Sequence, residues 1–142
     1  MSTVFSRIIA GELPGRFVWQ DEDVVAFLSI APLRPGHTLV VPRQEVDGWT
    51  EAGGDLLARC TAVAQAVGQA ARRAWDAPRA GLVVAGFEVP HMHIHVFPAW
   101  EMADFDFGRV DHSPEPAGLD EAAERLRGAL RELGHGASVP AG

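Results

Sequence analysis

Hydrophobic and polar residues alternate most regularly between residues 90 and 98. Here His91, His93 and His95 are separated by single apolar residues, and a proline closes the run. Successive side chains of a β-strand point to opposite faces of the sheet. The pattern therefore predicts a half-buried strand that carries three imidazoles on one face and is anchored in a core by its apolar face.

Four further strands are predicted from short apolar runs bounded by turn residues. They cover Phe17–Gln20, Val24–Leu28, His37–Pro42 and Gly81–Gly86. The acidic residues 21–23 lie between the first two runs, and such a polar cluster is typical of a hairpin turn.

Apolar residues at helical spacing predict three helices. The first is short, begins after Thr3 or Ser2 as its N-cap, and ends before Gly11. The longest covers residues 55–75 and is rich in alanine, and the last covers residues 119–134 and ends at a glycine.

Together these elements predict one α+β domain over residues 1–142. We expect a five-stranded antiparallel meander sheet with one long helix, a short N-terminal helix and a C-terminal helix. The core should lie within residues 3–98, with a loop at 99–118, rich in Pro, Gly and Asp, and a mobile tail at 135–142.

Charge and cysteine content narrow the classes of function. The 142 residues carry a formal net charge of −7, which argues against binding nucleic acid polymers, because these need a basic surface. The single cysteine, Cys60, precludes an internal disulfide and fits a reducing compartment. No signal-peptide core or apolar run of membrane-spanning length is present. We therefore expect a cytoplasmic protein without membrane partners.

A metal site is one interpretation of the three histidines, but it does not use all of them well. Same-face residues of a strand are about 7 Å apart, so His91 and His95 are separated by about 14 Å at Cα. Zn–N bonds are only about 2.1 Å long. At least one histidine therefore needs another role.

Nucleophilic catalysis accounts for all three positions. A neutral imidazole with an ordinary pKa of about 6.5 is a good nucleophile towards phosphorus near neutral pH. One histidine would attack, while its neighbours would donate hydrogen bonds and hold the attacking ring in the correct tautomer. The remaining alternative is that three histidines share a solvated sheet face by chance.

The run from His91 to Phe97 matches His-φ-His-φ-His-φ-φ, where φ is apolar, and thereby resembles the signature of the histidine-triad family of nucleotide hydrolases and transferases. The similarity extends over residues 3–98. It includes the segments Phe5–Pro14, Ala26–Pro32, Pro35–Pro42, Ala85–Gly86 and Val89–His91.

The resemblance implies a mechanism with named roles. His93 would be the nucleophile and would form a covalent nucleotidyl-histidine intermediate, which water or another acceptor resolves. The backbone of His91 would fix the ring of His93. His95 and His37 would contact the phosphate of a nucleotide-like substrate, and the reaction would break a phosphoramidate or phosphoanhydride bond without a cofactor.

The resemblance also implies a nucleoside pocket and a homodimer with a continuous sheet. The pocket would be formed by apolar residues, namely Val4, Phe5, Ile8, Phe27 and Ile30. Each of these is equally well explained by plain core packing. The alanine-rich helix is a candidate dimer surface, although core packing explains it too.

The sequence departs from the family pattern around the substrate. Ser29 stands where many members have a ribose-binding Asp, and Phe87 and Glu88 replace a Gln-Ser/Thr pair. Phe87 cannot donate a hydrogen bond, and an ionised Glu88 pointing inward would repel a phosphate, although it fits a solvated strand end better. Thr3 and Ser6 occupy the positions of two zinc-binding cysteines in some members, so we expect no metal.

Flanking residues offer weaker candidates. Arg34 and Arg43 lie near His37 and could supply positive charge to a phosphate, although surface arginines are common. The aromatic residues of the 99–118 loop could close over a substrate, or form a packed edge or dimer contact; these are Trp100, Phe105 and Phe107.

Three functions follow from these observations. The first is an enzyme that works through His93. The second is a non-catalytic nucleotide-binding or regulatory protein, favoured by Ser29, Phe87 and Glu88. The third is a metal-dependent cupin-type barrel, which fits poorly because of the long helix and because Glu101, the nearest acidic residue, lies too far from His95.

Overall fold

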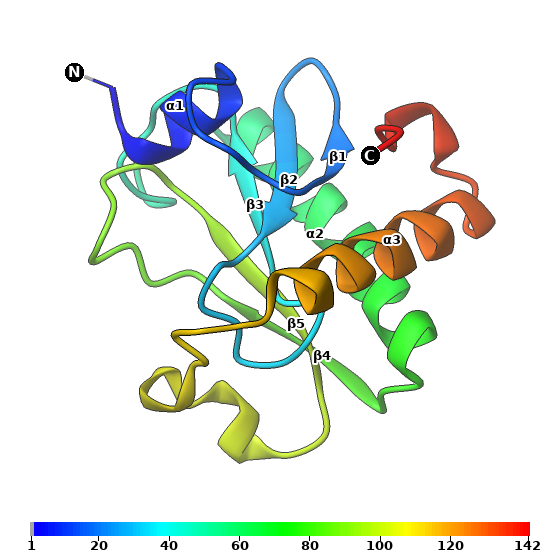
Figure 1. The fold of residues 1–142 in the computed structure, drawn as a ribbon. Coiled ribbons are helices and arrows are strands. Elements are labelled where there is room, and N and C mark those ends of the chain that lie inside the picture. The colour runs from blue at the N-terminus through cyan, green and yellow to red at the C-terminus, as the bar shows by residue number, and fades with distance from the viewer. Residues whose placement is uncertain (1) are drawn as a thin grey trace.

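The computed structural model describes residues 2–142 as a five-stranded antiparallel sheet with helices on both faces (Figure 1). The elements in chain order are α1 (Val4–Ile9), β1 (Phe17–Gln20), β2 (Val24–Leu28), β3 (Thr38–Pro42), α2 (Gly54–Trp75), β4 (Arg79–Val83), β5 (Ile94–Ala99), the 3₁₀ helices η1 (Met102–Phe105) and η2 (Phe107–Arg109), α3 (Pro116–Glu132) and η3 (Gly136–Ser138). No helix within these residues is both long enough and apolar enough to span a membrane.

The predicted α+β class with five antiparallel strands is confirmed, but the strand order differs from a meander in one place. The order is β1-β2-β3-β5-β4, because α2 carries the chain from β3 to the far edge and the β4–β5 hairpin then returns β5 inside (Figure 1). β5 is therefore paired with β3 on one side and β4 on the other. An open sheet covered by helices also excludes the all-β barrel of the cupin-type alternative.

The fourth strand lies at Arg79–Val83 and not at residues 81–86 as predicted. Gly81 lies inside the ladder, opposite Phe97. This position requires a glycine, because a Cβ atom there would lie only 2.4 Å from Phe97 Cζ. The chain leaves the sheet after Val83, and Gly86 adopts a positive φ of 80° in the following loop. Gly81 therefore lies within the strand, and Gly86 lies beyond its end.

The fifth strand begins at Ile94, so of the three triad histidines only His95 lies in the ladder. The predicted alternation of faces still holds, because Met92, Ile94 and Val96 all pack in the main core. The predicted stop at Pro98 is wrong. The strand continues to Ala99, since beyond Val96 it pairs with β4 alone, and Pro98 is tolerated there.

The two faces of the sheet have different neighbours, as β2 demonstrates. Val24, Ala26 and Leu28 point into the main core with α2 and α3, whereas Val25 and Phe27 pack with α1. The small residues of α2 allow a close approach of helix and sheet: a Cβ atom on Gly68 would lie 3.4 Å from that of Ala80. The alanine-rich face of α2 is therefore largely core.

The C-terminal third also differs in detail from the prediction. α3 begins at Pro116, three residues early, because proline suits the first turn of a helix. It ends before Gly134, whose positive φ of 95° stops the helix as predicted. The predicted loop contains two 3₁₀ helices, and within residues 135–142 Val139 packs against the main core.

Candidate active site

The histidines gather on the sheet face that carries α1. His95 lies opposite Leu39 on β3, and Leu39 packs in the same cluster as Phe5 and Phe27. His93 immediately precedes β5, with its ring centroid 5.0 Å from that of His95 and 4.8 Å from that of Phe5. The structure therefore brings the predicted histidines and the start of α1 together.

His91 is completely buried, and both of its ring nitrogens are bonded. Nε2 lies 2.7 Å from the carbonyl oxygen of Pro42, and Nδ1 lies 2.7 Å from the hydroxyl of Thr3. A carbonyl oxygen can only accept, so Nε2 carries the proton. In the neutral ring, Nδ1 then accepts the Thr3 hydroxyl proton.

His93 is 6% exposed and is oriented by the backbone of His91. Its Nδ1–H donates to the carbonyl oxygen of His91 at 2.8 Å, which leaves Nε2 as the nitrogen with a lone pair. Burial lowers the pKa of His93, and this effect outweighs the hydrogen bond to His91, which acts in the opposite direction. The ring is therefore neutral at pH 7.

A chain of hydrogen bonds fixes the tautomers of His37 and His95. The backbone N–H of Leu33 donates to His37 Nδ1 at 2.9 Å, so the proton of a neutral His37 sits on Nε2. This Nε2–H donates to His95 Nδ1 at 2.9 Å. The proton of His95 must then sit on its own Nε2, which becomes a donor towards the site.

Burial keeps both of these rings neutral. Desolvation and then the neighbouring His95 lower the pKa of His37 to about 3, and desolvation followed by His93 lowers the pKa of His95 to about 4. His37 and His95 are therefore neutral over the whole physiological pH range.

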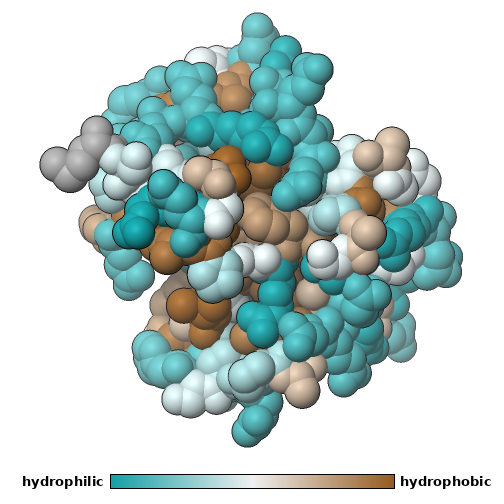
Figure 2. Space-filling view, turned by 45° about the horizontal axis from the view of Figure 1, so that its top comes forward, coloured by the Kyte–Doolittle hydropathy of each residue, from teal (hydrophilic) through white to brown (hydrophobic). Residues whose placement is uncertain are grey.

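Only part of the expected nucleoside pocket forms one cluster. Phe5 and Phe27 are buried with ring centroids 5.7 Å apart, and the half-buried Ile8 packs against them. Val4 and Ile30 are 43% and 76% exposed and lie outside this cluster. Figure 2 shows hydrophobic residues in the hollowed centre of one face of the molecule, surrounded by polar ones.

The three substituted positions have different environments. Ser29 is nearly buried, and its hydroxyl oxygen accepts from the N–H of Ala31. Phe87 is 97% exposed and contributes nothing to the core. Glu88 is also exposed, yet its charge raises the pKa of His93 slightly against the larger effect of burial.

Of the loop aromatics, only Phe107 borders the histidines. Its ring centroid lies 4.8 Å from that of His95, whereas Phe105 packs on Phe97 and Trp100 lies against the guanidinium of Arg34. Arg34 also pairs with Asp104 at 2.7 Å. This arginine is thus committed to the loop, and Arg43 donates to the backbone of the hairpin turn.

The residues at the zinc-binding positions of some family members do not fit a zinc ion. Thr3 and Ser6 provide hydroxyls, which zinc rarely takes as ligands, and both bond to Glu45 or His91. Within residues 2–142 no three His, Cys, Asp or Glu side chains are grouped to hold a metal.

Sequence reasoning missed several residues that shape the site. The N-cap role of Thr3 was predicted, but its contact with His91 spans 88 residues and has no local signal. The Leu33 N–H, which sets the tautomer of His37, is a backbone group and leaves no trace in residue type. The same holds for the carbonyls of Pro42 and His91.

Comparison with known proteins places the chain among relatives of similar length. A family profile described as HIT domain matches residues 10–102. An uncharacterized HIT-like protein of Methanocaldococcus jannaschii is 33% identical over 132 residues, which cover 88% of this chain and 98% of that protein.

Solved structures give the same result. A HIT-like protein from Bartonella henselae, described as involved in cell-cycle regulation, has a TM-score of 0.80 at 27% identity and covers 90% of this chain and 96% of its own. A zinc-bound histidine triad protein from Mycobacterium smegmatis has a TM-score of 0.78 at 29% identity. The match covers 94% of this chain and 96% of that protein.

A hypothetical histidine triad nucleotide-binding protein from Sulfolobus tokodaii has a TM-score of 0.75 at 28% identity. The match covers 91% of this chain and 92% of that protein. The profile match includes the triad and the strands around it, and the structural matches extend over nearly the whole fold. The chain therefore belongs to the HIT-domain, or histidine-triad, family.

Proposed function

We propose that this protein is a nucleotide-binding hydrolase or transferase that cleaves a phosphoramidate or phosphoanhydride bond through His93. The observation that supports the proposal most strongly is the hydrogen bond from His93 Nδ1–H to the His91 carbonyl at 2.8 Å. It leaves Nε2 with a lone pair, and burial keeps this nitrogen unprotonated at neutral pH. Membership of the family and the nucleotide-binding relative point in the same direction.

In the first step, Nε2 of His93 attacks the α-phosphorus and forms a P–N bond. The bond from phosphorus to the leaving group breaks, and the leaving group departs with the electron pair. The imidazole ring now carries a positive charge. The His91 carbonyl oxygen, already bonded to Nδ1–H, stabilises that charge without having to reorganise.

His95 supports both steps through its Nε2–H. This nitrogen carries the proton because the relay from Leu33 through His37 fixes the tautomer of His95. It can stabilise a phosphoryl oxygen, or protonate the departing group and regain a proton from water. In the second step a water oxygen attacks the phosphorus and loses its proton to solvent, and the P–Nε2 bond breaks with its electron pair returning to Nε2. The nucleoside monophosphate is released, and His93 returns to its neutral form.

The nucleoside end of the substrate would lie on the α1 side. Phe5, at 4.8 Å from the His93 ring, forms the wall next to the nucleophile, with Phe27 and Ile8 behind it. This arrangement suits a flat base or sugar that contacts apolar side chains. Ser29 can offer only a neutral hydroxyl to the ribose, which predicts weaker ribose binding than a carboxylate would give.

The charges near the triad favour a phosphoramidate over a polyphosphate. Among carboxylates and guanidinium groups in the described residues, only Glu88 shifts the pKa of His37, His93 or His95. A chain of phosphates beyond the scissile bond would need cations, and an amine leaving group would be attracted to Glu88. Both considerations favour an amine leaving group.

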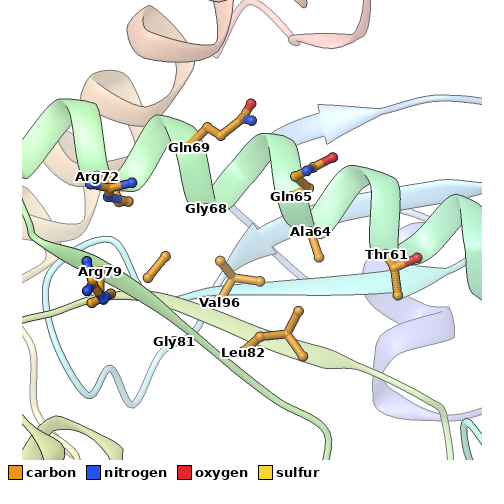
Figure 3. Close-up of a pocket in the computed structure, with 11 residues that line it drawn as sticks. Thr61, Ala64, Gln65, Gly68, Gln69, Arg72, Arg79, Gly81, Leu82 and Val96 are labelled. Atoms are coloured by element: carbon orange, nitrogen blue, oxygen red, sulfur yellow. The ribbon is translucent and has the colours of Figure 1, made fainter.

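We also propose that the chain forms homodimers through the α2–β4 side. β4 pairs only with β5 and so leaves one edge open, and Leu82 on it is 54% exposed. A groove of about 390 Å³ between α2 and β4 borders this edge; Figure 3 shows Arg72 and Arg79 at one end of it. Sedimentation of wild type and of Leu82→Arg tests the proposal, with a monomeric variant as the expected result.

The remaining partner predictions stay proposals: a cytoplasmic location, and no binding of membranes or nucleic acid polymers. They are supported by the formal charge of −7 and the single cysteine.

The experiment that tests the function is a panel of nucleoside 5′-phosphoramidates and dinucleoside polyphosphates, assayed with wild type and His93→Ala. We expect turnover of phosphoramidates by the wild type and a loss of at least about a thousandfold in the variant. The competing function, binding without catalysis, is favoured by Phe87, which cannot donate a hydrogen bond to a phosphate. Saturable binding of a nucleoside monophosphate without turnover of any panel member would establish it instead.

A further inference from the structure

We propose that Thr3, held in place by Glu45 and Ser6, is a positioning residue that fixes the backbone carbonyl to which the nucleophile donates. The proposal rests on the function proposed above, because the orientation of His93 matters to the rate only if His93 reacts. It assigns a role to the N-terminal residues that lies outside the four histidines.

The carbonyl of His91 is not held by the sheet. β5 begins at Ile94, so His91 and Met92 lie before the first ladder pair. The backbone there has only two anchors, the bond from the N–H of His91 to the Val89 oxygen and that from the N–H of Met92 to the Val46 oxygen. Val89 and Val46 both lie in loops. The side chain of His91 must therefore supply much of the restraint.

That side chain is clamped between two elements. Nε2–H donates to the Pro42 carbonyl at the end of β3, and Nδ1 faces the Thr3 hydroxyl at the start of α1. The ring is fully buried, so loss of either partner leaves a polar nitrogen without water to replace it. The clamp thereby fixes the plane of the ring and, through Cα, the direction of the carbonyl.

The single proton of the Thr3 hydroxyl goes to His91. Thr3 Oγ1 accepts from the N–H of Ser6 at 3.0 Å, as a helix N-cap does. Its two candidate acceptors are His91 Nδ1 at 2.7 Å and Ser6 Oγ at 3.3 Å. The shorter distance identifies His91 as the acceptor, because its other nitrogen already carries a proton.

Glu45 holds this end of α1 against the loop after β3. Its Oε1 accepts from the backbone N–H of Thr3 at 3.1 Å and from the hydroxyl of Ser6. These hydrogen bonds lower the pKa of Glu45, with that from Ser6 the larger effect, so the carboxylate is ionised at neutral pH. Glu45 is thus connected to the nucleophile through Thr3, which bonds to the His91 ring, and through the His91 carbonyl, which accepts from His93 Nδ1.

The test compares Thr3→Val, which keeps the shape of the side chain and loses its hydroxyl, with Thr3→Ser, which keeps the hydroxyl. Thr50→Val, an exposed loop threonine, is the matched control. On the phosphoramidate that wild type turns over fastest, we expect Thr3→Val to lower kcat by about tenfold with KM nearly unchanged, and Thr3→Ser to restore most of it. The control should match wild type.

A second readout needs no substrate. Long-range ¹H–¹⁵N spectra of histidine-labelled protein report which ring nitrogen carries the proton. We expect wild type to show His93 protonated on Nδ1 and His91 on Nε2, and Thr3→Val to show a mixture of tautomers at His93. Glu45→Ala, at an exposed position, should shift the same signals less strongly, and it decides the question if Thr3→Val does not fold.

An unchanged kcat together with unchanged tautomers in Thr3→Val and Glu45→Ala would overturn the proposal. Failure of Thr3→Ser to restore kcat would overturn it as well, because the hydroxyl would not be the active feature. If wild type turns over no substrate, the proposed function fails, and the positioning contact then stands or falls on the spectra alone.

Discussion

The Nδ1 atom of His93 lies 2.8 Å from the carbonyl oxygen of His91, and this contact decides which nitrogen can react. A carbonyl accepts but cannot donate, so Nδ1 is protonated and Nε2 is not. A second carbonyl, that of Pro42, settles the tautomer of His91 in the same way. Backbone oxygens therefore set the tautomers of these two rings, while burial keeps the reactive ring neutral.

Neutral buried histidines should make folding stability depend on pH in the mildly acidic range. The folded-state pKa values of His37 and His95, about 3 and about 4, lie below the ordinary value of 6.5. At pH values between these folded-state pKa values and 6.5, the unfolded chain binds more protons than the folded chain does. The free energy of unfolding therefore falls as the pH decreases below 6.5. We expect the free energy of unfolding in urea to be lower at pH 5.5 than at pH 7.5.

The control for this pH effect is His112, which is exposed. Its replacement by Gln should leave the difference in unfolding free energy between pH 5.5 and pH 7.5 unchanged. His37→Gln should reduce it, because one buried titrating ring is removed. A difference of the same size in His37→Gln and wild type would contradict the assignment of the effect to the triad region.

The relay from His37 to His95 predicts an ordering of two variants. Gln can place its amide N–H₂ where His37 has Nε2–H and can still donate to His95 Nδ1 at the 2.9 Å contact. Leu cannot, and the tautomer of His95 is then free to change. We expect His37→Leu to lower kcat by about a hundredfold and His37→Gln to lower it much less. Equal losses in both would show that His37 matters only for packing.

The two ends of the predicted nucleoside pocket should behave differently. Phe5 is 7% exposed and contacts His93, so Phe5→Ala should raise KM for every nucleoside substrate and cost about 3–5 kcal/mol of stability. Ile30 is 76% exposed, and Ile30→Ala should change stability by less than about 0.5 kcal/mol. Urea unfolding and steady-state kinetics measure both effects.

Glu88 should influence the choice of leaving group. Glu88→Gln removes the carboxylate whose charge acts on His93, without a large change of shape. We expect the ratio of kcat/KM for a dinucleoside polyphosphate to that for an amine phosphoramidate to rise severalfold. High salt should reduce the difference between wild type and variant, because screening weakens exposed charges. An unchanged ratio would place Glu88 outside the electrostatics of the reaction.

The local patterns predicted the elements well where local patterning decides them. β1 and β2 have the predicted bounds, and α2 begins one residue before the prediction, because apolar spacing and turn residues specify these segments directly. The sidedness of Met92, Ile94 and Val96 was also correct. The bounds of β4 and β5 were wrong, since the partner strand and not the alternation decides where a ladder begins.

In the candidate site, too, the sequence predicts the features that residue type and spacing decide and does not predict those that depend on tertiary contacts. The triad and His37 were found from residue type and spacing, and the structure brings them together. Their tautomers depend on Leu33 N–H and on the carbonyls of Pro42 and His91, which every residue carries. The Thr3–His91 contact joins two residues that are 88 positions apart in the sequence, so it becomes visible only in three dimensions.

The most direct test of the account is to locate the covalent bond. Histidine-labelled protein is mixed with the best phosphoramidate, quenched at alkaline pH within the first turnover, and examined by mass spectrometry and ³¹P–¹⁵N correlation. We expect one nucleoside monophosphoryl group per chain, attached to Nε2 of His93. Attachment at Nδ1 or at another residue, or turnover by His93→Ala at the wild-type rate, would contradict the central claim.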